Sequence, residues 1–131
     1  MKRDIESRND IESLLYTFYR KAFADETIGY FFKEVVPLDL NIHIPQITDF
    51  WESILFNTQG YRKNVMAIHQ EISNKSTITK KHLNQWLKMF IETISEEFEG
   101  GKAELMKQRA TSIATLMEIR FNQSNLQSPK Q

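Results

Sequence analysis

The stretch KKHLNQWLKMFIETISEEF, residues 80–98, places its large apolar side chains on a single face of a helix. These side chains recur every three or four residues, which is the spacing of neighbours along one side of an α-helix. Thr79 precedes the stretch as an N-cap, and Gly100 and Gly101 follow it as a stop signal. We therefore predict a long helix from Thr79 to about Phe98. Its inward face comprises Leu83, Trp86, Leu87, Phe90, Ile91, Ile94 and Phe98.

Other segments on both sides show the same helical periodicity, and no segment alternates with the two-residue period of a strand. Asn9 is the predicted N-cap of the first helix, with Glu12 as its capping-box partner. Pro45 is expected in the first turn of the second helix, where its missing N–H costs nothing. The predicted fold class is all-α, with a single domain over 1–121 and a polar, disordered tail over 122–131. The further helices are expected over 10–24, 41–55, 65–72 and 102–121.

Composition and charge exclude several classes of function. The chain has 131 residues, the size of one domain, and 17 basic and 17 acidic residues give it no net charge. This balance argues against a nucleic-acid partner, because that affinity depends on surplus cations. The absence of cysteine excludes disulfides, thiolate catalysis and iron–sulfur clusters. The sequence has neither an apolar run long enough to span a membrane nor a secretory signal, so we expect a cytoplasmic protein without a membrane partner.

Two of the three histidines stand where polar residues are unexpected. His43 and His69 each lie on the apolar stripe of a different predicted helix, whereas His82 follows two lysines and is expected at the surface. One such histidine is ordinarily a core residue that is hydrogen-bonded to a backbone carbonyl. Two such histidines on different helices also suit the binding of a ligand. Zinc needs three or four protein ligands, but haem needs one protein ligand and a polar partner on its other side.

The apolar residues near these histidines could wall a flat, dry slot for haem. The alternative is an ordinary helical core, because aromatic stripes at helical spacing usually pack there. Tyr19 and Trp86 carry hydrogen-bond donors that need an acceptor inside such an interior. The expected wall residues are Phe32, Phe50, Trp51, Met66, Trp86, Leu87 and Phe90.

Four stretches resemble, in this order, the group III truncated haemoglobins, bacterial globins with a two-over-two helical sandwich: LLYTFYRKAFADETIGYFF, HIPQITDFW, YRKNVMAIH and HLNQWLKMF. The resemblance covers about residues 11–121. Its most specific parts are the Phe18-Tyr19 pair, His43 followed by Phe50-Trp51, and the Trp86-Leu87 pair in the long helix.

The resemblance implies a role for particular residues. His69 matches the iron ligand, and Phe32 matches the phenylalanine that stacks on the haem. The distal ligand pocket is expected to comprise Tyr19, His43, Ile47 and Trp86. The residues expected to contact haem are Phe32, Phe50, Trp51, Tyr61, Met66, His69, Leu87 and Phe90.

The function implied by the resemblance is the binding of O₂, NO or CO to haem b, iron protoporphyrin IX. A pocket with several hydrogen-bond donors suits retention of the ligand, or turnover of NO or peroxide, better than easy delivery of O₂. An NO dioxygenase or peroxidase-like activity would need a reductase as electron donor. The alternative is a haem-less sensor or protein-interaction module that keeps a globin fold, in which His69 is an ordinary core residue.

Overall fold

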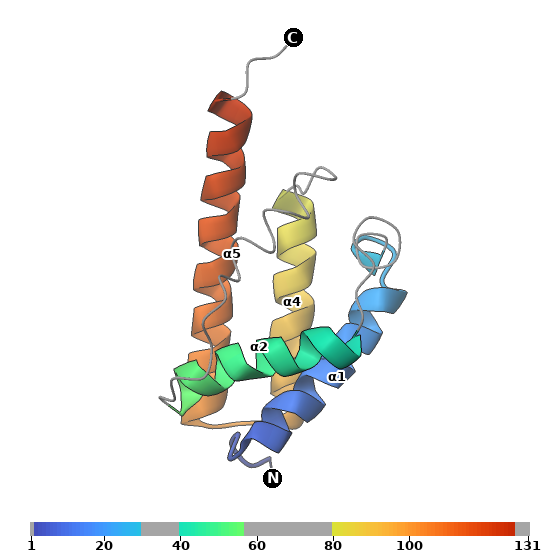
Figure 1. Cartoon of the computed structure of the whole chain (residues 1–131), viewed down its shortest axis with the longest axis vertical. Coiled ribbons are helices and arrows are strands. Elements are labelled where there is room, and N and C mark those ends of the chain that lie inside the picture. Colours follow the sequence, from blue (N-terminus) through green and yellow to red (C-terminus); the bar gives the residue numbers. More distant parts are fainter. Residues whose placement is uncertain (1, 30–39, 57–79, 128–131) are drawn as a thin grey trace.

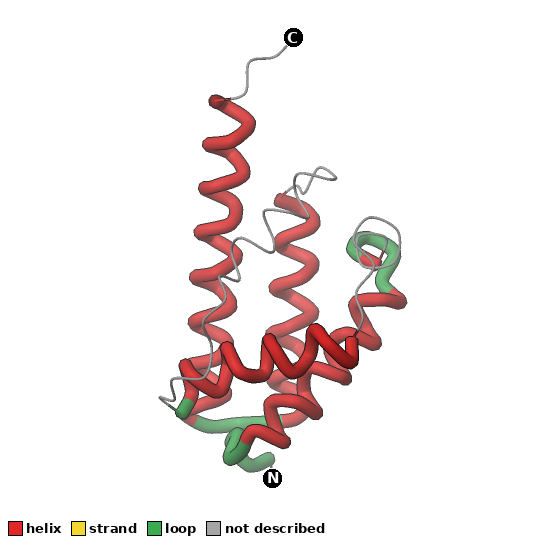
Figure 2. The backbone as a smooth tube through the Cα atoms, viewed as in Figure 1, coloured by secondary structure: helices red, strands yellow, loops and turns green. Residues whose placement is uncertain are grey.

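A computed structural model describes residues 2–29, 40–56 and 80–127 of the chain, and the helix predicted over 65–72 lies outside them. The described residues form the helices α1 (Arg8–Ala24), α2 (Leu40–Leu55), α4 (Lys80–Glu97) and α5 (Gly101–Gln127) and contain no strand (Figures 1 and 2). This confirms the predicted all-α class. None of these helices is both long enough and apolar enough to cross a membrane.

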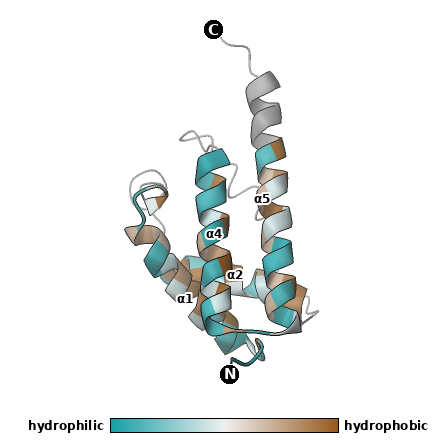
Figure 3. Cartoon of the chain, turned by 180° about the vertical axis from the view of Figure 1, so that it is seen from behind, coloured by the Kyte–Doolittle hydropathy of each residue, from teal (hydrophilic) through white to brown (hydrophobic). Residues whose placement is uncertain are grey.

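The helices form two crossed pairs. α4 and α5 run side by side, and α2 lies across them together with α1 (Figure 1). Helix α1 contacts both α2 and α4, so it joins the two pairs. The arrangement is the predicted two-over-two sandwich. The N-terminal turns of α4 are polar (Figure 3).

Helix α1 buries one apolar face but begins two residues earlier than predicted. Its N-cap is Ser7, whose hydroxyl accepts from the Asp10 backbone N–H at 3.4 Å, so the assignment of Asn9 as the cap is wrong. Both residues are good caps. The Asp10 carboxylate decides between them, because it is held by the Arg3 guanidinium at 2.6 and 2.7 Å and accepts from the Glu6 N–H at 2.8 Å. These bonds fix the turn that places Ser7 at the helix end.

Helix α2 begins at Leu40, so Pro45 stands in its second turn and not in the first turn as predicted. A proline inside a helix removes a backbone hydrogen bond and crowds the preceding turn, at a cost of about 3 kcal/mol. The apolar face of the helix offsets this cost, because its large side chains are almost fully buried. The buried apolar residues of α2 are Ile44, Ile47, Trp51 and Leu55.

The N-terminal segment closes the junction between α4 and α5, which the periodicity does not predict. Asp4 caps α5 from a distance, because its carboxylate accepts from the N–H groups of Lys102 and Ala103, both at 2.9 Å. Burial alone would raise the pKa of Asp4, but these bonds and a third from the Ile5 N–H outweigh it and lower the pKa. The Ile5 side chain is buried in the core.

Helix α5 extends to Gln127, which is six residues beyond the predicted end at Phe121. The apolar pattern stops at Phe121, but residues 122–127 contain neither glycine nor proline, so nothing interrupts the backbone hydrogen bonds. Pro129 is the first residue that disfavours a helix. The start of the predicted tail over 122–131 is therefore helical, and residues 128–131 lie outside the described part.

Replacing Gly100 by alanine should lower the free energy of unfolding by about 1–3 kcal/mol. Gly100 has φ of +147°, and a Cβ atom there would lie 2.5 Å from Cγ of Asp4, the carboxylate that caps α5. Urea denaturation measures the loss. The matched control is Gly101→Ala, which has nothing within 4 Å of the new Cβ and should be as stable as the wild type. Equal stability of the two variants would contradict this account of the junction.

Candidate functional site

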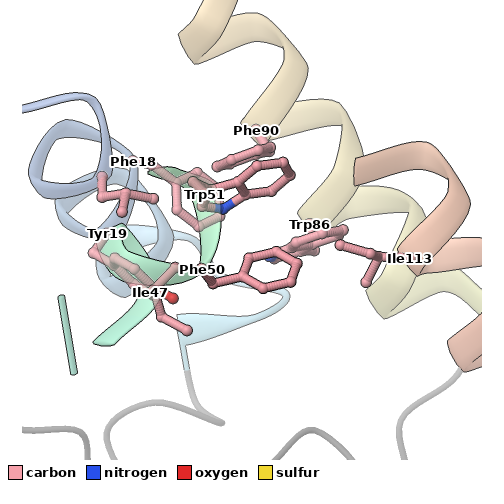
Figure 4. A pocket seen from close by; sticks show the side chains of 9 residues that line it. Phe18, Tyr19, Ile47, Phe50, Trp51, Trp86, Phe90 and Ile113 are labelled. Carbon is pink, nitrogen blue, oxygen red and sulfur yellow. The ribbon is translucent and has the colours of Figure 1, made fainter. Parts of the chain in front are cut away.

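A small cavity lies between α1, α2 and α4 and is closed on one side by α5 (Figure 4). Its volume is about 30 Å³, which suits a water-sized or diatomic molecule. Aromatic and aliphatic side chains make up the whole lining, so a polar group that faces the cavity has few hydrogen-bond partners there. The lining residues are Leu15, Phe18, Tyr19, Ile47, Phe50, Trp51, Trp86, Phe90 and Ile113.

Tyr19 brings a hydroxyl group to this apolar lining. The residue is 7% exposed, and burial raises its pKa, so the phenol stays protonated. The Tyr19 hydroxyl lies 2.7 Å from Nε2 of His43 on α2, and the two rings meet edge to face with centroids 5.2 Å apart. One hydrogen-bonded pair therefore joins α1 and α2 next to the cavity.

Phe90 is the centre of the aromatic packing. Trp86 and Trp51 both stack on it, with centroids 5.7 and 5.6 Å from the Phe90 centroid and interplanar angles of 5° and 26°. The edge of Phe18 closes the cluster at 5.0 Å. Offset stacking and edge-to-face contacts are the favourable arrangements for such rings, so the cluster holds the cavity wall in a fixed shape.

Polar contacts away from the cavity set the positions of the helices that line it. Arg8 at the start of α1 donates to Asp49 at 2.6 Å and to Glu52 at 3.0 Å, both on α2. Asp25, just after α1, accepts from the Gln85 side chain of α4 at 2.8 Å. Together these contacts hold α1 against α2 and α4. Tyr19 lies on α1, between Arg8 and Asp25 in the sequence.

The structure brings together most of the predicted site residues that it describes. His43 contacts the cavity through Tyr19, whereas Leu87 packs on the core without lining the cavity. Leu15, Phe18 and Ile113 also line it, although the sequence does not single them out as site residues. Their helical stripes are the signal that could have found them. The predicted residues at the cavity itself are Tyr19, Ile47, Phe50, Trp51, Trp86 and Phe90.

The wall of the haem site opposite these cavity residues is predicted from the sequence alone. Phe32, Tyr61, Met66 and His69 lie outside the described residues. His82, expected at the surface, is partly buried; burial and the charge of Lys81 lower its pKa. Within the described ranges, no three residues of the metal-ligating types His, Cys, Asp and Glu come together.

Comparison with known proteins gives one result that concerns the fold. No protein-family model matches the chain, and no curated protein does. A solved structure, the group III truncated hemoglobin from Campylobacter jejuni, has a similar fold with a TM-score of 0.77 and 22% sequence identity. The match covers 92% of this chain and 95% of that chain. The chain therefore has the truncated-globin fold, which confirms at the level of structure the resemblance seen in the sequence.

Proposed function

We propose that the chain binds haem b and, beside it, a diatomic ligand such as O₂, NO or CO. The observation that carries the proposal is the Tyr19–His43 pair, at 2.7 Å, next to a cavity of about 30 Å³ with an otherwise apolar lining. A cavity of this size fits the diatomic ligand, and the surrounding rings offer flat apolar surfaces to the cofactor. The chemistry of the described residues therefore suits the ligand side of a haem site.

The proposed haem contacts come from both walls. On the described side, Phe50, Trp51 and Phe90 line the cavity, and Leu87 lies on the same helix as Phe90. On the other side we propose His69 as the single protein ligand to the metal, with Phe32, Tyr61 and Met66 around the cofactor. His69 would hold the haem iron, and haem would supply a metal able to bind a diatomic ligand.

The chain's own donors would retain the ligand. Tyr19 offers an O–H group and Trp86 an indole N–H group, and both residues line the cavity. A hydrogen bond is stronger in a dry interior than in water, so these donors favour a ligand whose outer atom carries negative charge. We propose a role in retention of the ligand or in turnover of NO or peroxide. The turnover would use electrons from a reductase.

A haem-less sensor or interaction module is the second candidate. The observation that favours it is the stacking of Trp51 and Trp86 on Phe90, because a cluster that packs on itself needs no cofactor. The two candidate functions predict different results when hemin is added to the protein. A module has no saturable hemin site.

Hemin should quench most of the tryptophan fluorescence and saturate at one hemin per chain. Both tryptophans of the chain, Trp51 and Trp86, line the cavity, and haem absorbs light at the wavelengths where tryptophan emits. Trp51→Phe and Trp86→Phe each leave one reporter, and both should show the same saturation point. Quenching that rises without saturation would favour the haem-less module.

A further inference from the structure

A hollow lies on the surface between the first turns of α4 and the turn that follows α1. Its volume is about 420 Å³, which is within the usual size of a site for a small molecule. Every residue that lines it is polar or positively charged, and these turns of α4 are hydrophilic in Figure 3. We refer to this feature as the lysine hollow. Its lining residues are Thr27, Lys80, Lys81, Asn84, Gln85 and Lys88.

Most of the residues that α4 contributes to the hollow share one face of the helix. Asn84 and Gln85 stand three and four residues after Lys81, which is the spacing of neighbours along one side of an α-helix. Lys88 stands seven residues after Lys81, so the two lysines are about 10 Å apart along the helix axis. Thr27 brings a hydroxyl group from the opposite side. The hollow therefore has a cation at each end of the helix face and hydrogen-bonding groups between them.

The described part of the chain leaves the lysine charges of the hollow largely uncompensated. Lys81 and Lys88 form no ion pair with any residue over 2–29, 40–56 and 80–127, and Nζ of Lys80 lies as far as 4.0 Å from Oε1 of Glu118. Charges of one sign that line a hollow concentrate the electric field there and raise the local concentration of counter-ions. The lysine hollow thus favours an anion.

Asp25 holds both sides of the hollow in place. Its carboxylate accepts from the Gln85 side chain and from the Thr27 backbone N–H, both at 2.8 Å. These two lining residues are therefore positioned before any ligand binds, which lowers the entropic cost of binding. Asp25 itself does not line the hollow, and neither do the exposed residues Glu26 and Glu92. The lining presents ammonium, amide and hydroxyl groups without a carboxylate.

We propose that the lysine hollow binds a small anion of linked phosphate groups. Lysine ammonium groups bind phosphate as point charges, and amide N–H and hydroxyl groups donate further hydrogen bonds to its oxygens. Two cations about 10 Å apart suit an anion with charge at both ends better than a single phosphate. The lining has no aromatic side chain on which a base could stack, so the phosphate chain itself is the part that is recognised.

This site is separate from the proposed haem site. Trp86 and Phe90 face the cavity from α4, and neither lines the lysine hollow. Binding of the anion therefore does not depend on haem, and the full chain without hemin is suitable for the test.

Isothermal titration calorimetry with tripolyphosphate tests the site at an ionic strength of about 10 mM, where screening is weak. One anion should bind per chain. Lys81→Gln and Lys88→Gln should each weaken binding by about three- to tenfold, because each removes one charged donor and keeps an amide. The matched control is Lys107→Gln on α5, which removes the same charge from a lysine that pairs with Glu104, and it should bind as the wild type does.

Two further anions test which chemistry is recognised. Inorganic phosphate should bind more weakly than tripolyphosphate, because it cannot contact both ends of the hollow. ATP should bind as tightly as tripolyphosphate if the phosphate chain is sufficient, and tighter binding of ATP would support the site and identify a nucleotide as the source of the phosphates.

Three results would overturn the proposal. The first is an absence of tripolyphosphate binding at low ionic strength. The second is an equal loss of affinity in Lys107→Gln and Lys81→Gln, which would show attraction to the whole surface. The third is equally tight binding of inorganic phosphate and tripolyphosphate. Backbone amide shifts in the ¹H–¹⁵N NMR spectrum give an independent reading, since tripolyphosphate should move those of Thr27 and residues 81–88 most.

Discussion

Replacing His69 by alanine should abolish stable hemin binding, so that no Soret band remains after gel filtration of the loaded protein. His69 is the single protein ligand proposed for the metal. A ligand that binds only the folded chain stabilises it by about 4 kcal/mol at a concentration 1,000 times its dissociation constant. The rise in melting temperature caused by hemin should therefore disappear as well.

The matched control for this experiment is His82→Ala. His82 lies on α4, is partly buried, and does not line the cavity, so its loss should leave the Soret band and the hemin-dependent melting temperature unchanged. A Soret band that persists in His69→Ala would contradict the assignment of the ligand. Adding His43→Ala to that variant would then show whether His43 binds the metal in its place.

Tyr19→Phe should speed O₂ dissociation by roughly ten- to a hundredfold and change CO dissociation much less. The substitution keeps the ring and removes only the donor. A hydrogen bond to a charged acceptor contributes about 1.5–3 kcal/mol, and each 1.4 kcal/mol corresponds to about a factor of ten in rate. Bound O₂ carries negative charge toward its outer atom, whereas CO is nearly apolar. Stopped-flow displacement measures both rates.

Two further variants test the origin of this effect. Tyr16→Phe removes the hydroxyl of a tyrosine that is 37% exposed on the same helix, and it should leave both rates unchanged. Trp86→Phe should act in the same direction as Tyr19→Phe, and the double variant should be non-additive if both donors contact one ligand. Equal O₂ dissociation rates in wild type and Tyr19→Phe would mean that Tyr19 does not contact the ligand.

The periodicity of the sequence predicts the fold because each helix buries one continuous stripe. Phe18 and Ile94 show this, since both stand at the predicted spacing and both are almost fully buried. The errors concern the ends of the helices, because an apolar stripe does not determine which residue caps a helix. Ser7 and Asn9 are both suitable caps, and the choice depends on an aspartate held by Arg3. The capping of α5 by Asp4 joins residues far apart in the sequence, which no local pattern contains.

The sequence predicts which residues belong to the candidate site, but not how these residues are arranged in space. Tyr19, Ile47 and Trp86 come to one cavity because each stands on the inward stripe of its own helix. The contact between Tyr19 and His43 depends on how α1 crosses α2, and this angle follows from packing and from the bonds of Arg8. Leu87 illustrates the same limit, because its place on the predicted stripe does not bring it to the cavity.

The absorption spectrum of the chain during titration with hemin tests the central claim most directly. The account predicts a Soret band that grows in proportion to added hemin, saturates at one hemin per chain, and shifts when the loaded protein is reduced and exposed to CO. A spectrum that remains that of free hemin at every ratio, with no change in tryptophan fluorescence beyond that of unspecific quenching, would contradict it.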